Sequence, residues 1–214
     1  MEMEYIASML FRWSHVLFGI AWIGLLYYFN FIQGGYFKSA SPEALADAKT
    51  KLAPNALWWF HWAAMLTFIT GVLLLYVLKT NHQLNPYILL GAVMGTLMFL
   101  NVWLIIWPNQ KIALGMVEGD AAAAGGKALL ASRTNTLFSA PMVFCMLAGP
   151  HFAASGAGYG SAMLTNGLYV SLGLVALLEI NAIIGKQGPM TTVNGVITSS
   201  VVLTAVLVSI LMMV

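Results

Sequence analysis

An arginine and a histidine lie one helical turn apart within the first apolar stretch of the chain, residues 12–30. As a helix this stretch is long enough to cross a bilayer core, and ionisable side chains inside such a span are costly and typical of functional sites. Helical spacing places Arg12, His15 and Gly19 on one face, together with Trp22. An imidazole supplies a ligand atom, and a glycine one turn away leaves room for a flat group, so this face predicts a haem b site. The alternative is that His15 only forms a hydrogen bond across a helix bundle.

A second group of polar side chains falls inside or beside the later apolar stretches. Glu179 lies within the run VALLEINAII, where a carboxyl group is costly unless it is paired or protonated. One interpretation is a pocket for a small planar polar molecule, a quinone head group or a purine-like anion, with Arg133 supplying positive charge. The other is a set of hydrogen bonds between helices with a salt bridge between Glu179 and Arg133. The candidate pocket residues are Arg133, Asn135, Asn101 and Glu179.

The composition identifies the class of protein that positions these residues. Of 214 residues, 60% are hydrophobic and only 7% are charged, and the mean hydropathy is +0.85. A soluble domain with so few charges would expose one continuous apolar surface, so we expect an integral membrane protein in contact with lipid. The net charge of +2 gives no indication of nucleic-acid binding. The sequence has one cysteine and no C-x-x-C-H motif, which excludes covalent c-type haem attachment.

Six apolar stretches are long enough to cross the membrane, since a span needs about 20 apolar residues. We therefore predict an all-α bundle of six transmembrane helices that forms a single domain over residues 1–214. The N-terminus, MEMEY, lacks the basic region of a signal peptide, so the first helix is expected to be retained. The expected spans are residues 5–32, 57–78, 87–107, 129–152, 163–184 and 193–214.

Three local signals refine this pattern. Ser41 followed by Pro42 predicts the start of a short surface helix between the first two spans. Gly91 and Gly95 form a G-x-x-x-G pattern, which is typical of close helix packing in membranes. The sequence WPNQK predicts that the third helix ends at Pro108, because proline removes a backbone donor.

The basic residues predict the orientation, because cytoplasmic loops of membrane proteins carry an excess of lysine and arginine. The basic residues gather in or beside the first, third and fifth loops, and on the opposite side only Lys79 lies near a helix end. Both termini are therefore expected outside, in the periplasm of a Gram-negative cell, with the chain in the inner membrane. The residues in or beside the first, third and fifth loops are Lys38, Lys49, Lys51, Lys111, Lys127, Arg133 and Lys186.

This orientation also sets the expected depth of each histidine. His15 and His151 fall in the outer half and are the pair best matched in depth for a six-coordinate haem, with Arg12 beside a propionate. His61 lies toward the cytoplasmic face. It is either the ligand of a second site or, if the first two helices are displaced along the membrane normal, the partner of His15. His82 is expected to be a loop residue. The polar residues expected in one cytoplasmic-side layer are Asn30, His61, Asn101, Arg133, Asn135, Glu179 and Asn181.

Three segments of the chain resemble a known family. They are RWSHVLFGIAWIGLLYYFNF, NVWLIIWPNQK and SRTNTLFSAPMVFCMLAGPHF. These segments are similar to the membrane domain of the bacterial membrane-bound urate hydroxylases, the urate oxidase N-terminal domain family. The resemblance touches at least the first four spans. The positions it covers are His15, Gly19, Trp22, Asn101, residues 107–111, Arg133, Asn135, Pro141, Met142 and His151.

The resemblance implies a membrane protein that couples urate oxidation to a c-type cytochrome, often fused at the C-terminus and therefore periplasmic. The outside C-terminus expected from the lysines agrees with that arrangement. The chain departs from the family because it has no C-x-x-C-H motif, and it is shorter than the family's full membrane domain. The urate substrate is therefore less firmly implied than the electron-handling role.

Two functions from different classes follow. The first is a haem-b-binding membrane oxidoreductase or electron-transfer protein of the urate hydroxylase membrane-domain type, which passes electrons to a separate periplasmic c-type cytochrome. The second is a cofactor-free accessory subunit of a larger respiratory or other membrane complex. Ionisable residues inside the spans favour the first, whereas the small size and G-x-x-x-G packing favour the second. Either function is compatible with a homo-oligomer.

Overall fold

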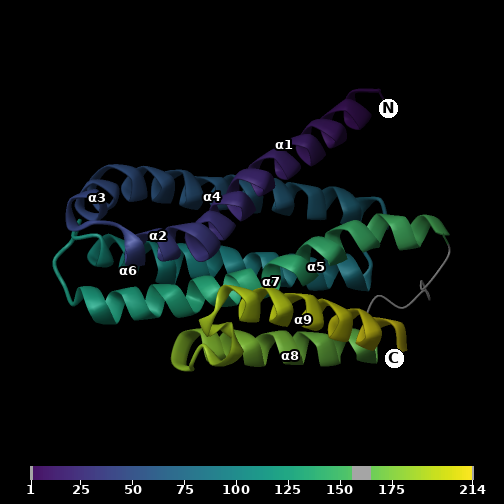
Figure 1. Cartoon of the computed structure of the whole chain (residues 1–214). Helices are drawn as coiled ribbons and strands as arrows, with labels where there is room; N and C mark the ends of the chain where they lie inside the picture. The colour runs from purple at the N-terminus through teal and green to yellow at the C-terminus, as the bar shows by residue number, and fades with distance from the viewer. Residues whose placement is uncertain (1, 156–164, 214) are drawn as a thin grey trace.

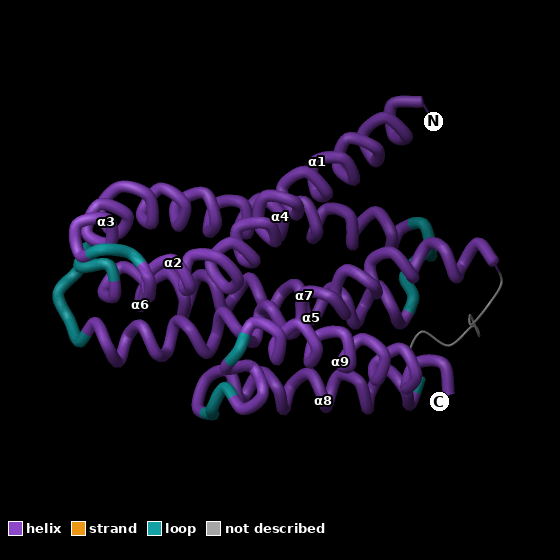
Figure 2. The backbone as a smooth tube through the Cα atoms, in the orientation of Figure 1, coloured by secondary structure: helices purple, strands orange, loops and turns teal. Residues whose placement is uncertain are grey.

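The computed structural model describes residues 2–155 and 165–213, and every regular element in these residues is helical (Figure 2). The predicted fifth span, residues 163–184, begins just outside the described residues. The long helices are α1 (Glu2–Tyr27), α4 (Ala53–Thr80), α5 (Pro86–Leu100), α7 (Ala121–Ser155), α8 (Asn166–Ile184) and α9 (Val193–Met213). The short helices are α2 (Gly34–Ser39), α3 (Pro42–Asp47) and α6 (Trp107–Ala113). Three π-helical segments, Tyr28–Gln33, Ala48–Leu52 and Asn101–Ile106, and a 3₁₀ turn, Gly188–Thr191, connect them.

Five helical stretches in the described residues are long and apolar enough to cross a membrane. They correspond to five of the six predicted spans. The predicted fourth span, residues 129–152, lies within α7, which is long enough but is not among the five. The chain is therefore an all-helical, multi-pass membrane protein. The five stretches are Tyr5–Ser39, Pro42–Thr80, Pro86–Ala113, Asn166–Ile184 and Val193–Met213.

The middle of α7 lies inside the bundle, whereas parts of the helix on either side of it are exposed, as at Leu129 and Leu147. It contacts α1, α5, α6, α8 and α9, and every residue from 131 to 139 is buried. The surrounding helices instead expose large apolar side chains, such as Trp59 on α4 and Val201 on α9. A helix that is enclosed on all sides needs no apolar face toward lipid, which explains why polar residues are tolerated in its middle.

The two ends of the described chain lie at the same end of the bundle (Figure 1). α1 leaves the bundle toward its N-terminal end, and α9 finishes beneath it on the same side of the molecule (Figure 1). Successive long helices run in alternating directions between this end of the bundle and the opposite end (Figure 1). This arrangement requires α7 to cross the bundle like the five apolar stretches.

The predicted surface helix after the first span is confirmed as α3. Ser41 is its N-cap, and the Oγ atom accepts a hydrogen bond from the backbone N–H of Ala44 at 3.3 Å. Pro42 is the first helical residue, where a missing N–H has no consequence. The cap and the proline together set where α3 begins.

The predicted end of the third helix at Pro108 is wrong. The chain remains helical from α5 through the π-helical segment Asn101–Ile106 and on to the end of α6. Pro108 lies in the first turn of α6, immediately after the wider π turn. The backbone hydrogen bonds have already changed register in that π turn, so the helix accommodates the missing N–H of proline there. The side-chain amide of Asn109 donates to the backbone oxygen of Ile105 at 2.7 Å and satisfies one of the displaced carbonyls.

The glycines of the third span pack against α7, as the G-x-x-x-G pattern predicts. A Cβ atom added at Gly91 would lie 3.1 Å from the Cβ atom of Cys145 and 3.4 Å from the backbone oxygen of Met142. At Gly95 an added Cβ atom would lie 4.0 Å from the Cγ atom of Met142, which is an ordinary contact. Gly91 therefore lies at a close contact between α5 and α7.

Replacing Gly91 by valine should lower the free energy of unfolding by about 1–3 kcal/mol, because the new side chain overpacks this contact. The change is measured by thermal unfolding of the detergent-solubilised protein. Gly24→Val is the matched control, since a Cβ atom added at Gly24 in α1 meets nothing within 4 Å. An equal loss in both variants would mean that helix propensity, and not the contact with α7, causes the effect.

Candidate functional site

Polar side chains in the middle of α7 bond to several neighbouring segments at about the same level of the bundle. The hydroxyl of Ser132 accepts a hydrogen bond from the amide of Asn30 at 2.7 Å. Ser139, farther along α7, shares a 2.9 Å hydrogen bond with the hydroxyl of Tyr27. The hydroxyl of Ser200 on α9 donates to the backbone oxygen of Leu137 at 2.8 Å. These bonds tie α1 and α9 to the central helix, so the polar residues of α7 are structural as well as candidates for chemistry.

One cluster joins three helices and contains three of the four predicted pocket residues. The amide of Asn101 donates to the Oδ1 atom of Asn135 at 3.0 Å and to the Oε2 atom of Glu179 at 3.1 Å. The amide of Asn135 donates to the backbone oxygen of Met98 at 2.9 Å. The two asparagines are at most 1% exposed, whereas Glu179 is partly exposed. We call these three residues the amide–carboxyl cluster: Asn101, Asn135 and Glu179.

Arg133, the fourth predicted pocket residue, points to another side of α7. Residues two positions apart on a helix differ by about 200° in direction, so Arg133 and Asn135 cannot share one face. The Nη1 atom of Arg133 donates to the backbone oxygen of Thr192 at 3.4 Å, and the Nε atom is buried without a partner. Arg133 and Glu179, both described, form no ion pair. The predicted salt bridge between them is therefore wrong.

His61 lies in a cage of tryptophans. The imidazole stacks on Trp107 with ring centroids 3.9 Å apart, and Trp103 and Trp62 lie at 5.2 and 5.6 Å. The Nδ1 atom donates to the backbone oxygen of Leu57 at 2.9 Å. Since a carbonyl only accepts, Nδ1 carries the hydrogen and Nε2 keeps its lone pair, which is the tautomer of a metal-ligating histidine.

His15 is bound to α4. Its Nδ1 atom lies 3.0 Å from the backbone oxygen of Thr67 and 3.1 Å from the hydroxyl of Thr70, so His15 forms a hydrogen bond to a neighbouring helix. This bond also leaves Nε2 with its lone pair. Beside Gly19, an added Cβ atom would lie 3.9 Å from Thr67, so α4 occupies the space next to that glycine. Trp22 is buried.

The remaining predicted residues lie at the surface. Arg12 is exposed on α1. His151 is exposed near the end of α7, and its Nδ1 atom donates to the backbone oxygen of Leu147 at 2.8 Å. His82 is an exposed turn residue with a φ of 55°, as expected for a loop. His15 faces α4 and His151 bonds within its own helix, so the structure does not bring these two rings into contact.

Several residues near the candidate site were not predicted. Trp103 and Trp107 are four positions apart, a spacing that places two side chains on one helical face, and this signal points to the cage. Gln33 was not predicted; it lies three positions after Asn30 in the π-helical segment Tyr28–Gln33, and each of these two residues has a buried side-chain oxygen without a partner.

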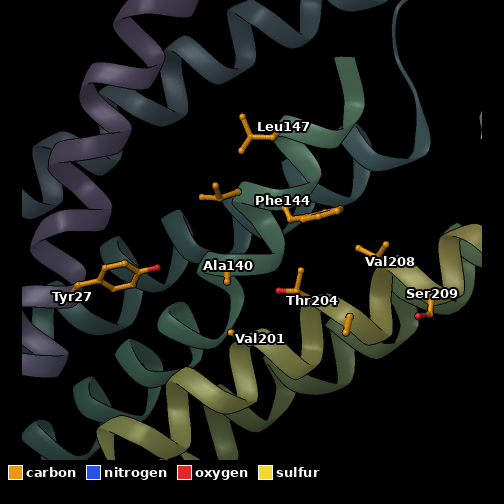
Figure 3. Close-up of a pocket in the computed structure, with 10 residues that line it drawn as sticks. Tyr27, Ala140, Phe144, Leu147, Val201, Thr204, Val208 and Ser209 are labelled. Carbon is orange, nitrogen blue, oxygen red and sulfur yellow. The ribbon is translucent and has the colours of Figure 1, made fainter. Parts of the chain in front are cut away.

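A groove of about 710 Å³ lies between α1, α7 and α9, and none of the predicted site residues lines it (Figure 3). Tyr27 on α1 stands at one end and Ser209 on α9 toward the other, and Ala140, Phe144 and Leu147 line the groove from α7 (Figure 3). The amide–carboxyl cluster is separate from this groove. The lining residues are Tyr27, Ala140, Val143, Phe144, Leu147, Val201, Thr204, Ala205, Val208 and Ser209.

The sequence profile of the family described as urate oxidase N-terminal matches residues 82–211. The chain belongs to the urate oxidase N-terminal family. The amide–carboxyl cluster, Arg133 and His151 lie within the matched region of the family, whereas His15 and His61 lie before it. No curated protein and no solved structure matches the chain.

Double-mutant cycles should separate the cluster from Arg133. The pair Asn101→Leu and Glu179→Leu should show a coupling free energy of about 0.5–3 kcal/mol, because the two side chains share a buried hydrogen bond. The pair Arg133→Leu and Glu179→Leu should be additive within about 0.5 kcal/mol, because no contact joins them. Both are measured by thermal or denaturant unfolding in detergent. A coupling between Arg133 and Glu179 as large as that between Asn101 and Glu179 would contradict the structure.

Proposed function

We propose that this chain is the membrane subunit of a urate-hydroxylase-type oxidoreductase in a bacterial inner membrane. In this proposal α7 is a membrane span that raises the number of crossings from five to six, both termini are periplasmic, and electrons pass to a separate c-type cytochrome. Membership of the urate oxidase N-terminal family supports the reaction class. The enclosed position of α7 supports the sixth span, because a polar helix shielded from lipid does not need the hydropathy of an exposed one.

The observation that carries the proposal is the amide–carboxyl cluster at the middle of the bundle. Asparagine amides present both donors and acceptors, which match the alternating N–H and C=O groups along the edge of a purine-like molecule. Glu179 provides the carboxylate that can take a proton from such a substrate. Because Glu179 is partly exposed, a substrate meets the cluster from the side of α8.

Haem b is the proposed electron carrier, and the histidines of the chain fit the requirements of axial ligands. His15, His61 and His151 each direct Nδ1 at a carbonyl oxygen, which orients the ring and leaves Nε2 for iron. His15 contacts α4 at Thr67, Thr70 and Gly71, which lie six to ten residues, about 9–15 Å along the helix axis, beyond His61. We therefore treat His15 and His61 as separate candidate ligands and not as a pair. Bound haem would supply one-electron chemistry between substrate and cytochrome.

His15→Ala should remove or convert a b-type absorption band in the reduced-minus-oxidised spectrum of the purified protein, because the iron loses one axial ligand. His61→Ala and His151→Ala assign the second ligand in the same way, and His82→Ala is the control that should leave the spectrum unchanged. In the wild type, urate should donate electrons to the haem, so that the absorption band of the reduced form appears. Glu179→Gln should keep the haem content but slow this reduction by about 10²-fold, a typical effect of losing a general base.

Two results would contradict the proposal. Absence of haem from the wild-type protein, or a wild-type spectrum in all four histidine variants, would favour a cofactor-free accessory subunit of a larger complex. If haem is present but urate never reduces it, the proposal of a haem cofactor stands and the proposal of urate as the substrate is wrong.

A reporter fused after Val214 should lie in the periplasm, because six crossings return the chain to the side on which it began. The measurement is alkaline phosphatase activity of the fusion compared with β-galactosidase activity of the same fusion point. A fusion after Gln187, in the connection between α8 and α9, is the control and should report the cytoplasm. High β-galactosidase activity and low phosphatase activity of the fusion after Val214 would place it in the cytoplasm and show that the predicted number of crossings or orientation is wrong.

A further inference from the structure

The groove between α1, α7 and α9 lies on the lipid-facing surface of the bundle. Several of its lining side chains stay exposed, including Leu147 on α7 and Val201 on α9, each of which is 59% exposed. In a membrane protein such apolar side chains face hydrocarbon and not water. The groove volume of about 710 Å³ lies within the range of sites that hold small organic molecules. A molecule dissolved in the bilayer can therefore enter the groove from the side.

Three of the ten residues that line the groove carry a hydroxyl group, and the other seven are apolar. Two of these hydroxyl residues, Tyr27 and Thr204, lie on either side of Ala140, and their oxygen atoms point toward one another (Figure 3). The third, Ser209, is exposed toward the other end of the groove. Because the side chain of Ala140 is a single methyl group, it leaves room for a flat ring between the two hydroxyls.

The hydrogen of the Tyr27 hydroxyl is already used within the protein. Ser139 donates its single hydroxyl hydrogen to the backbone oxygen of Thr136 at 2.7 Å, because a carbonyl can only accept. The 2.9 Å hydrogen bond between Ser139 and Tyr27 must therefore be donated by Tyr27. The Tyr27 oxygen keeps a lone pair, so it offers the groove an acceptor and no donor.

Thr204 is in the same state. Its hydroxyl donates its single hydrogen to the backbone oxygen of Ser200 at 2.8 Å and keeps its lone pairs. The side chains at this end of the groove thus present two hydrogen-bond acceptors and no donor. A ligand that fits here must bring its own donors, since a carbonyl group placed between these oxygens would find no hydrogen-bond partner.

We propose that this groove binds the reduced form of a membrane quinone, a quinol with an isoprenoid tail. A quinol carries two O–H donors on opposite edges of its ring, which match the acceptors on either side of Ala140. The oxidised quinone carries only carbonyl acceptors at those edges. Phe144, Leu147 and Val208 line the rest of the groove and provide an apolar surface for the start of the tail. The inference goes beyond the proposed function, because binding here requires neither haem nor urate.

The test is the thermal stability of the full chain in detergent, titrated anaerobically and without urate. The ligands are a decyl-benzoquinol, the corresponding quinone and the dimethyl ether of the quinol, which keeps the ring but has no donor. A ligand that binds only the folded state raises its stability. The quinol should stabilise the wild type with a half-saturating concentration at least tenfold below those of the quinone and the ether, because only the quinol can donate.

Variants of the two hydroxyls connect the response to the site. Tyr27→Phe and Thr204→Val each remove one acceptor with little change of shape, and each should raise the half-saturating concentration of the quinol about fivefold. Tyr76→Phe on α4 is the matched control, because Tyr76 is exposed and does not line the groove. This control should change the half-saturating concentration less than twofold.

A steric pair tests the groove itself. Val201 and Val202 are neighbours on α9 and are 59% and 55% exposed, but only Val201 lines the groove. Val201→Trp should abolish stabilisation by the quinol, whereas Val202→Trp should retain it. This comparison decides the matter if a hydroxyl variant does not fold.

Three results would overturn the inference. One is a quinone or an ether that stabilises the wild type as well as the quinol, which would mean that the donors have no role. Another is equal stabilisation by dioleoylglycerol, which would assign the groove to a lipid with a hydroxyl group. The third is the same response in Val201→Trp and Val202→Trp, which would place the quinol elsewhere. None of these measurements follows haem or urate oxidation, so failure here leaves the proposed function separately testable.

Discussion

The fold depends on burying a polar helix segment inside apolar helices. Residues 131–139 of α7 are all buried, yet they include a serine, an arginine, two threonines and an asparagine in succession. In a membrane each of these groups needs a partner within the protein, because lipid offers none. Ser132 is bonded by Asn30 and Asn135 by Asn101 in the third span, whereas the hydroxyls of Thr134 and Thr136 donate to carbonyl oxygens of α7 itself. Ser200 on α9 adds a bond to the backbone of α7. These hydrogen bonds therefore determine how the outer helices are arranged around α7.

The π-helical segments help to meet this requirement. Asn30 lies in the segment Tyr28–Gln33 and Asn101 begins the segment Asn101–Ile106, and both donate to α7. A π turn shifts the side-chain register of a helix and is frequent at functional sites. Through these shifts, two long apolar helices each direct one amide inward while keeping their other side chains toward lipid or neighbouring helices.

The sequence predicted the elements well and their mutual arrangement only in part. Apolar runs located five of the long helices, and Ser41 and Gly91 correctly indicated a cap and a packing contact, because each of these signals is local. Pro108 misled because a proline ends a regular α-helix but is accommodated after a π turn. The grouping of Asn101, Asn135 and Glu179 was predicted from depth alone. Depth gave no rotational direction, so it also placed Arg133 with Glu179, from which the structure separates it.

The polar middle of α7 also has a consequence for the biogenesis of the protein. A segment with Arg133 and several hydroxyl and amide groups near its centre partitions poorly from the translocon into lipid on its own. Some of its partners, Thr192 and Ser200, belong to segments that are synthesised after it. The stable integration of α7 therefore depends on chain that has not yet left the ribosome when α7 emerges. The preceding apolar helices have no such dependence on later sequence for their entry into the bilayer, so α7 is the step at which membrane insertion and tertiary folding of this chain become a single process.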